Sequence, residues 1–204
     1  MKWNDKMTIT NDIIKALKPC ADGYENFTNN YPNYSGDAAN FLSLENIDYE
    51  DKVWVMTRLL TKNQNAKWAI ACANSVLPIF ERAHPKDMKP RELLEFISSF
   101  TDLNNISNED LTKLNKLRNA TTAAANSTSG AAAYGAAYAA ASAANYTAYS
   151  AAATTTVSAY TTAAYANAAC VIDTYAVGYA HAFNSAKKVQ QDLNLRLLLE
   201  VLCE

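Results

Sequence analysis

Apolar residues recur at helical spacing through the first 118 residues, and most of these runs follow a residue that can cap a helix. The run DIIKALK predicts a short helix over residues 11–18, stopped by Pro19. The next tract, ADGYENFTNNYPNYSG, is rich in Asn, Tyr and Gly and predicts a loop, and GDAANFLSLE predicts a brief helical turn. We therefore expect residues 1–46 to be an irregular segment with short helices.

The pattern of residues 47–118 predicts a helical subdomain. Asp48 and Asp51 form an acidic start to a helix whose core face carries Tyr49, Val53, Met56 and Leu60. The next helix is predicted to begin near Asn65 and to run through AKWAIACANSVLPIFERAH. Within it, Pro78 lacks a backbone N–H donor, which predicts a kink or a break at Leu77.

Two shorter helices are predicted to complete this subdomain. Asp87 or Lys89 can cap the first of them, which has Pro90 in its first turn and a buried stripe formed by Leu93, Phe96, Ile97 and Phe100. Ser107 and Asp110 have the spacing of a capping box and precede Leu111, Leu114 and Leu117.

Alanine dominates the remaining residues, 119–204. Residues 120–186 include 28 alanines in 67 positions, and Asp173 is the one formal charge in the 68 residues between Arg118 and Lys187. Because alanine has the highest intrinsic helix propensity, about three long helices are predicted between residues 119 and 183, and strands are not expected.

Turns or irregularities in this region are expected at Gly130 and at the β-branched run over residues 154–157. A last helix from Ala186 is predicted to pack on the bundle through Leu195, Leu198, Leu199 and Leu202. The predicted fold class is all-α: a helical bundle with short N-terminal helices and a loop, then long alanine-rich helices and a leucine-rich C-terminal helix. Residues 47–118 and 119–204 are expected to pack as one compact unit.

The composition excludes several classes of function. The chain has 204 residues, enough for one core or two small helical subdomains, with 18 Lys and Arg against 20 Asp and Glu. Without a basic excess, binding to duplex nucleic acid is not expected. The sequence contains no apolar window long enough to span a membrane and no signal-like start, so we expect a soluble, cytoplasmic protein without membrane association.

Cysteine and histidine usage gives no sign of a metal site. The cysteines are far apart in the sequence, and we expect reduced, mostly buried thiols at Cys20, Cys72, Cys170 and Cys203. Only His84 and His181 supply imidazoles, so no metal and no cofactor is expected. Trp68 and Cys72, one helical turn apart, are predicted to be core residues.

Three groups of residues are candidates for binding. Opposite charges around a proline-bounded turn either clamp a helix junction or form a ligand site; they are Glu81, Asp87 and Arg91. An eleven-residue spacing, close to three helical turns, places a stripe of tyrosines on one face: Tyr138, Tyr149 and Tyr160. The third group is either a buried, satisfied pair or a site that hydrogen-bonds and stacks a nucleotide-like small molecule: Asp173, Tyr175, Tyr179 and His181.

Two sequence blocks carry a resemblance to a known family. EDKVWVMTRLL and NAKWAIACANSVLPIFERAHPKDMKPRELLEF, followed by an alanine-rich tract and a short leucine-rich helix, resemble the Imm-5-like immunity proteins of bacteria and their phages. The resemblance runs from residue 47 to the C-terminus and is sharpest in the block that holds Trp68, Cys72, Pro78, Phe80, Glu81, Pro85, Asp87, Pro90 and Arg91. It implies a non-catalytic protein that protects a cell or a phage by binding a target.

Three functions from different classes follow. The first is a binding protein that neutralises a protein toxin or defence effector, as an immunity protein or a phage counter-defence inhibitor. No nucleophile, base and orienting group occur at a recognisable spacing, so an enzyme is not expected. The second function is sequestration of a small molecule or nucleotide in a tyrosine-lined helical pocket. The third is ice binding, although the threonines keep no common spacing. The neutral alanine and tyrosine surface also predicts a homo-oligomer.

Overall fold

The computed structural model describes residues 8–151, 166 and 183–202, and it confirms the predicted all-α class. The chain forms two compact units, one within Met1–Thr61 and Leu198–Glu204 and the other within Lys62–Leu197. We call them the smaller and the larger unit. In the described ranges, the strands are limited to one pair of two-residue segments.

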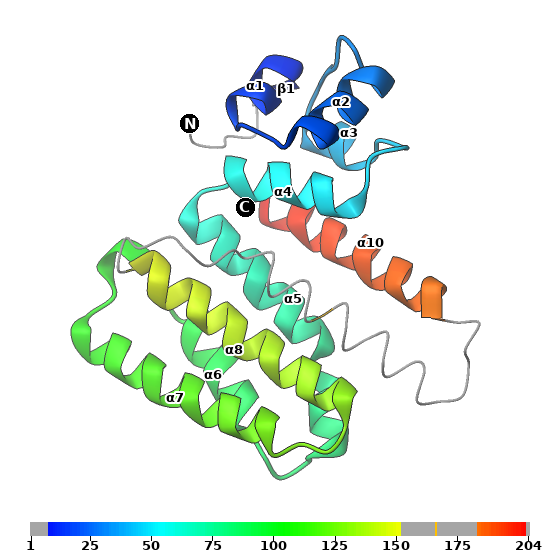
Figure 1. Ribbon diagram of the computed structural model, residues 1–204. Helices are drawn as coiled ribbons and strands as arrows, with labels where there is room; N and C mark the ends of the chain where they lie inside the picture. The colour runs from blue at the N-terminus through cyan, green and yellow to red at the C-terminus, as the bar shows by residue number, and fades with distance from the viewer. Residues whose placement is uncertain (1–7, 152–165, 167–182, 203–204) are drawn as a thin grey trace. The chain divides into compact units, whose positions relative to one another are not determined.

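The smaller unit alternates short helices with this strand pair (Figure 1). Its elements are β1 (Ile9–Thr10), α1 (Asn11–Ala16), α2 (Ala21–Asn30), β2 (Ser35–Gly36), α3 (Ala38–Leu42) and α4 (Tyr49–Leu59). The strands are antiparallel, with Ile9 opposite Gly36 and Thr10 opposite Ser35. The side chains of Thr10 and Asp37 cap α1 and α3 by accepting backbone hydrogen bonds of 3.3 and 2.8 Å.

The prediction of a loop after Pro19 is wrong, because this tract contains α2 and β2. Aromatic packing explains the difference: Phe27 is 4% exposed, and its ring centre lies 5.7–6.2 Å from those of Tyr31, Tyr34 and Phe41. Burial of this cluster outweighs the weak helix propensity of the Asn and Gly residues around it. The helical turn predicted before Ile47 is confirmed as α3.

The predicted core face of α4 is confirmed. Tyr49, Val53 and Met56 are buried along the helix, and Leu60 is buried just after its end. Asp48 occupies the position before the first turn but accepts no capping hydrogen bond there, so the acidic start acts through its charge near the helix N-terminus.

The larger unit contains the longer helices. They are α5 (Lys62–Ala83), α6 (Lys89–Ser98), the 3₁₀ helix η1 (Leu103–Asn105), α7 (Asn108–Asn126), α8 (Ala131–Ala151) and α10 (Phe183–Leu202), whose last residues belong to the smaller unit. The prediction of a break at Leu77 is wrong, since α5 is continuous through Pro78, whereas the alternative of a kink there stays a prediction. Pro78 and Asn74, whose carbonyl it leaves without an intrahelical donor, are both on the exposed side, where water can satisfy that carbonyl.

The helix start predicted for α7 is confirmed, and that of α6 is confirmed in part. The N-cap of α6 is Met88, without a side-chain capping bond, and not Asp87 or Lys89 as predicted, but Pro90 lies in the first turn, and Asp87 accepts a hydrogen bond from the backbone N–H of Lys89 at 3.1 Å. Ser107 caps α7 by accepting from the N–H of Asp110 at 3.0 Å. The buried stripe of α6 consists of Leu93, Leu94 and Ile97; the predicted members Phe96 and Phe100 are half-buried and meet edge to face.

Helix α8 occupies the centre of the larger unit. It packs against α5, α6 and α7, and Figure 1 shows it among these helices. Alanines on every side of α8 are buried: Ala133, Ala136, Ala137, Ala139, Ala140, Ala141, Ala143 and Ala144. A helix that is apolar all round is suited to such a position, and small side chains let the neighbouring helices approach closely. The turn predicted at Gly130 is confirmed, whereas the run over residues 154–157 lies outside the described residues.

Polar side chains connect α10 to α5. The indole Nε1 of Trp68 donates to the backbone oxygen of Asn194 at 2.9 Å, and Trp68 is fully buried. The amide of Gln190 donates to Ser75 Oγ at 2.9 Å and to Asn194 Oδ1 at 3.0 Å. Trp68 and Cys72 are therefore core residues, as predicted. No described helix combines the length and the apolar character needed to cross a bilayer.

Candidate functional site

A bidentate ion pair closes the junction between α5 and α6. Arg91 Nε and Nη2 donate to the two carboxylate oxygens of Glu81 at 2.5 and 2.8 Å. These hydrogen bonds, together with the charge of Glu81, raise the pKa of Arg91. The pair is the predicted junction clamp, and its fork geometry holds the two helix ends in one orientation.

Asp87, the third member of this predicted group, does not join the Glu81 and Arg91 pair. Its carboxylate instead contacts Lys89, whose Nζ lies 2.9 Å from Oδ2. Desolvation by partial burial tends to raise the pKa of Asp87, but the hydrogen bonds and charge of Lys89 outweigh it and lower that pKa. Asp87 thus fixes the start of α6, next to the clamp.

The α5–α6 loop and the α7–α8 turn lie at the same end of the larger unit (Figure 1). Thr121 of α7 contacts the start of α6, because its hydroxyl donates to the backbone oxygen of Lys89 at 3.2 Å. Two large apolar side chains are exposed on these elements: Met88 in the α5–α6 loop at 44% and Tyr134 in the first turn of α8 at 37%. We call residues 84–89 together with Tyr134 the bundle-end surface.

Aromatic contacts order the side chains around this surface. The His84 ring lies 5.0 Å from that of Phe80, which is itself buried. The rings of Tyr134 and Tyr138 are 4.5 Å apart, and the Tyr138 hydroxyl donates to Asn126 Oδ1 at 3.2 Å. The bundle-end surface therefore combines exposed apolar groups with aromatic neighbours that are held in place by packing and a hydrogen bond. This combination is suited to contact with a protein.

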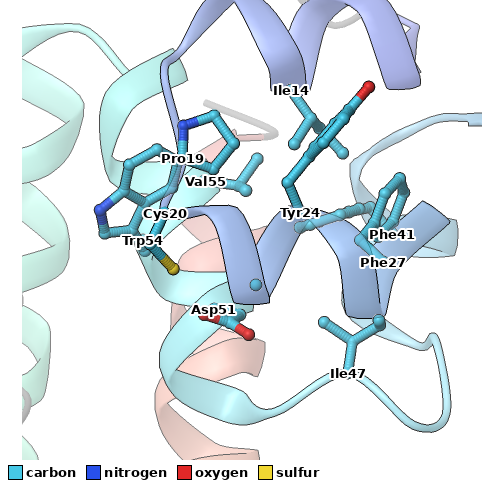
Figure 2. A pocket seen from close by; sticks show the side chains of 11 residues that line it. Ile14, Pro19, Cys20, Tyr24, Phe27, Phe41, Ile47, Asp51, Trp54 and Val55 are labelled. Carbon is cyan, nitrogen blue, oxygen red and sulfur yellow. The ribbon is translucent and has the colours of Figure 1, made fainter. Parts of the chain in front are cut away.

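A pocket of about 90 Å³ lies within the smaller unit (Figure 2). Residues of α1, α2, α3 and α4 and of the segments between them line it: Ile14, Pro19, Cys20, Gly23, Tyr24, Phe27, Phe41, Ile47, Asp51, Trp54 and Val55. Most of these walls are apolar, and the Cys20 thiol and the Asp51 carboxylate are the polar exceptions besides the Tyr24 hydroxyl and the Trp54 N–H. Sequence reasoning missed this pocket, because its residues share no local spacing and most of them lie in the segment predicted to be irregular.

The ionisable groups of the pocket and the core differ in their surroundings. Desolvation by burial raises the pKa of Asp51, and the like charges of Asp48 and Glu50 raise it further. Burial also raises the pKa of the Cys72 thiol.

Both described cysteines are free thiols, but Cys20 is exposed, so the prediction of burial is wrong for Cys20. Among the described residues, no His, Cys, Asp and Glu side chains gather into a group that could hold a metal ion.

The match to a protein family coincides with the α5–α6 hairpin. Residues 56–104 match the model of the family described as Imm-5 like putative immunity protein. The matched segment runs from the end of α4 through α5 and α6 into η1, and it includes the Glu81 and Arg91 clamp. No curated protein and no solved structure gives a significant match. The family match confirms the resemblance predicted from the sequence and suggests an immunity-type role.

The remaining predicted site residues are only partly described. Tyr138 is positioned at the end of the larger unit, and Tyr149 belongs to α8, but the Tyr149 side chain is not among those described. The other predicted binding residues lie outside the described residues: Tyr160, Asp173, Tyr175, Tyr179 and His181. The tyrosine stripe and the polar cluster around His181 therefore stay predictions.

Proposed function

We propose that this chain is a non-catalytic binding protein that neutralises a protein toxin or defence effector by occupying it. The observation that carries the proposal is the family match to the α5–α6 hairpin, since the family is described by an immunity role. The matched segment also contains residues 84–89 of the bundle-end surface, which lie between Glu81 and Arg91. An inhibitor of this kind acts in a fixed ratio to its target and turns nothing over.

The bundle-end surface is the contact area that we propose for the target. Protein interfaces are enriched in Met, aromatic residues and Arg, and a few central side chains contribute most of the binding energy. Met88 is the exposed apolar residue of the matched segment and is flanked by Asp87 and Lys89, which pair with each other. The Glu81 and Arg91 clamp holds the loop at its base, which lowers the entropy that ordering it on binding would cost.

Capture from the native host tests this proposal with matched variants. We expect the tagged chain to retain one protein in a fixed molar ratio, and Met88→Ala to weaken that complex about tenfold, as the loss of a central apolar contact does. Val189→Ala is the control, because Val189 is 65% exposed on α10 and lies outside the matched segment. The dissociation constants are measured by titrating each variant against the captured protein.

The two parts of the proposal fail separately. If neither host nor phage-infected lysate yields a protein retained in a fixed ratio, the inhibitor function is wrong. If a partner is retained but Met88→Ala and Val189→Ala bind it equally well, the function stands and the bundle-end surface is the wrong contact area.

A further inference from the structure

The pocket of the smaller unit has the chemistry of a small binding site, independent of the proposed inhibitor function. Its polar chemistry is concentrated on one side. Figure 2 shows the Cys20 sulfur and the Asp51 carboxylate facing the same region, between α2 and α4. The opposite walls are aliphatic and aromatic, from Ile14, Val55 and Tyr24 among others. A molecule that fills this space meets one carboxylate and a largely apolar surface.

Gly23 keeps the space between these two polar groups open. A Cβ atom at this position would lie 3.0 Å from Cys20 Sγ and 3.6 and 3.7 Å from the two carboxylate oxygens of Asp51. The thiol and the carboxylate therefore approach the same point from different sides. The absence of a side chain at Gly23 leaves that point accessible to another group.

The charge of Asp51 is not balanced by its surroundings. The charges that act on it most strongly are those of Asp48 and Glu50, which have the same sign. No hydrogen bond within the described residues reaches its carboxylate. Arg58, a cation of the same helix, is engaged with Trp54: its guanidinium lies 3.7 Å from the Trp54 ring centre, and its Nη1 donates to the Trp54 backbone oxygen at 3.1 Å. A cation placed in the pocket would neutralise Asp51.

The size of the pocket restricts the ligand. Its volume of about 90 Å³ is smaller than that of an engineered cavity of about 150 Å³ that admits benzene. A short, unbranched chain fits better than a ring. The pocket walls suit the carbon atoms of such a chain, and a charge-assisted hydrogen bond to Asp51 suits an ammonium group at its end.

We propose that this pocket binds a primary alkylammonium group, with the ammonium on the Asp51 carboxylate and the alkyl chain against Ile14, Val55 and Trp54. The same chemistry occurs in a free aliphatic amine and in the side chain of a lysine. Neither ligand would contact the bundle-end surface, so the proposed pocket and the proposed inhibitor function are tested independently.

The test is a titration of the full chain with n-butylammonium, followed by the backbone amide NMR signals of α2 and α4. We expect saturable shifts at these amides and about a tenfold or greater loss of affinity in Asp51→Asn, since this variant keeps the shape and removes the charge. Asp48→Asn is the matched control: it removes an equal charge from the start of α4, outside the pocket lining, and its side chain caps nothing. Its affinity is expected to change less than about twofold.

Two further ligands test whether the charge is required and which source of the amine the pocket prefers. 1-Butanol has the same number of heavy atoms without the charge and is expected to bind at least about tenfold more weakly. N-acetyl-lysine-N-methylamide distinguishes the sources: tighter binding than n-butylammonium assigns the pocket to a lysine, and weaker binding assigns it to a free amine. Equal binding of n-butylammonium to the original chain and to Asp51→Asn, equal binding of 1-butanol, or the absence of saturable shifts would overturn the proposal.

Asp51→Asn is expected to fold. Because burial and two like charges raise the pKa of Asp51, the ionised carboxylate opposes folding above that pKa, and an amide removes this opposition. Its thermal midpoint at neutral pH is therefore expected to equal or exceed that of the original chain. Weaker ligand binding then reports on the pocket and not on lost structure.

Discussion

Trp68→Ala is expected to lower the free energy of unfolding by about 3–5 kcal/mol, the range found when a large buried aromatic residue is truncated. Trp68 is fully buried in α5, and its indole N–H is bonded to the backbone of Asn194 in α10 at 2.9 Å. The substitution removes both the apolar contacts and this link between distant parts of the chain. Urea unfolding followed by far-UV circular dichroism measures the change.

Trp68→Phe separates the two contributions. Phenylalanine keeps much of the buried ring but removes the donor to the Asn194 carbonyl, so we expect a smaller loss of about 1–3 kcal/mol. If Trp68→Ala lowers the free energy of unfolding by less than about 1 kcal/mol, Trp68 does not hold α5 and α10 together as described.

Ala140→Leu is expected to destabilise the larger unit by about 1–3 kcal/mol or more, because α8 is enclosed by other helices and has no room for added carbon atoms. Ala140 is fully buried in the middle of α8. Ala131→Leu is the matched control, since Ala131 begins the same helix but is exposed. Its effect is expected to stay within about 0.5 kcal/mol.

The comparison of these two variants in urea tests the central position of α8. Equal stability of Ala140→Leu and Ala131→Leu would contradict it, because a leucine at a close helix contact must displace its neighbours. A loss confined to Ala140→Leu would show that alanine is required there for its small size, because leucine has nearly the same helix propensity.

Local signals in the sequence predicted much of the helical framework. Ser107 and Asp110 mark the start of α7, and the apolar spacing of α4 identifies its buried face, because both effects act within one or two helical turns. The same local reasoning predicted that Glu81 and Arg91 lie close together, with a clamp as one of two possible roles, since a short turn brings the ends of α5 and α6 together.

Features that depend on distant contacts were predicted less well. Helix α2 contains Asn and Gly, and it is stabilised by the packing of Phe27 on Phe41, which no local pattern reveals. The continuity of α5 depends on Pro78 facing outward, where its loss of a hydrogen bond costs little. The pocket at Asp51 also depends on contacts between residues distant in the sequence, because its lining includes residues of four helices.

The most direct test of the proposed inhibitor function is a titration of this chain against its captured target, with the activity of the target as the readout. A non-catalytic inhibitor predicts that residual activity falls linearly with added chain, reaches its minimum at a fixed molar ratio and does not fall further with time. Complete loss of activity at a small fraction of that ratio, progressing with incubation, would show turnover and contradict the account.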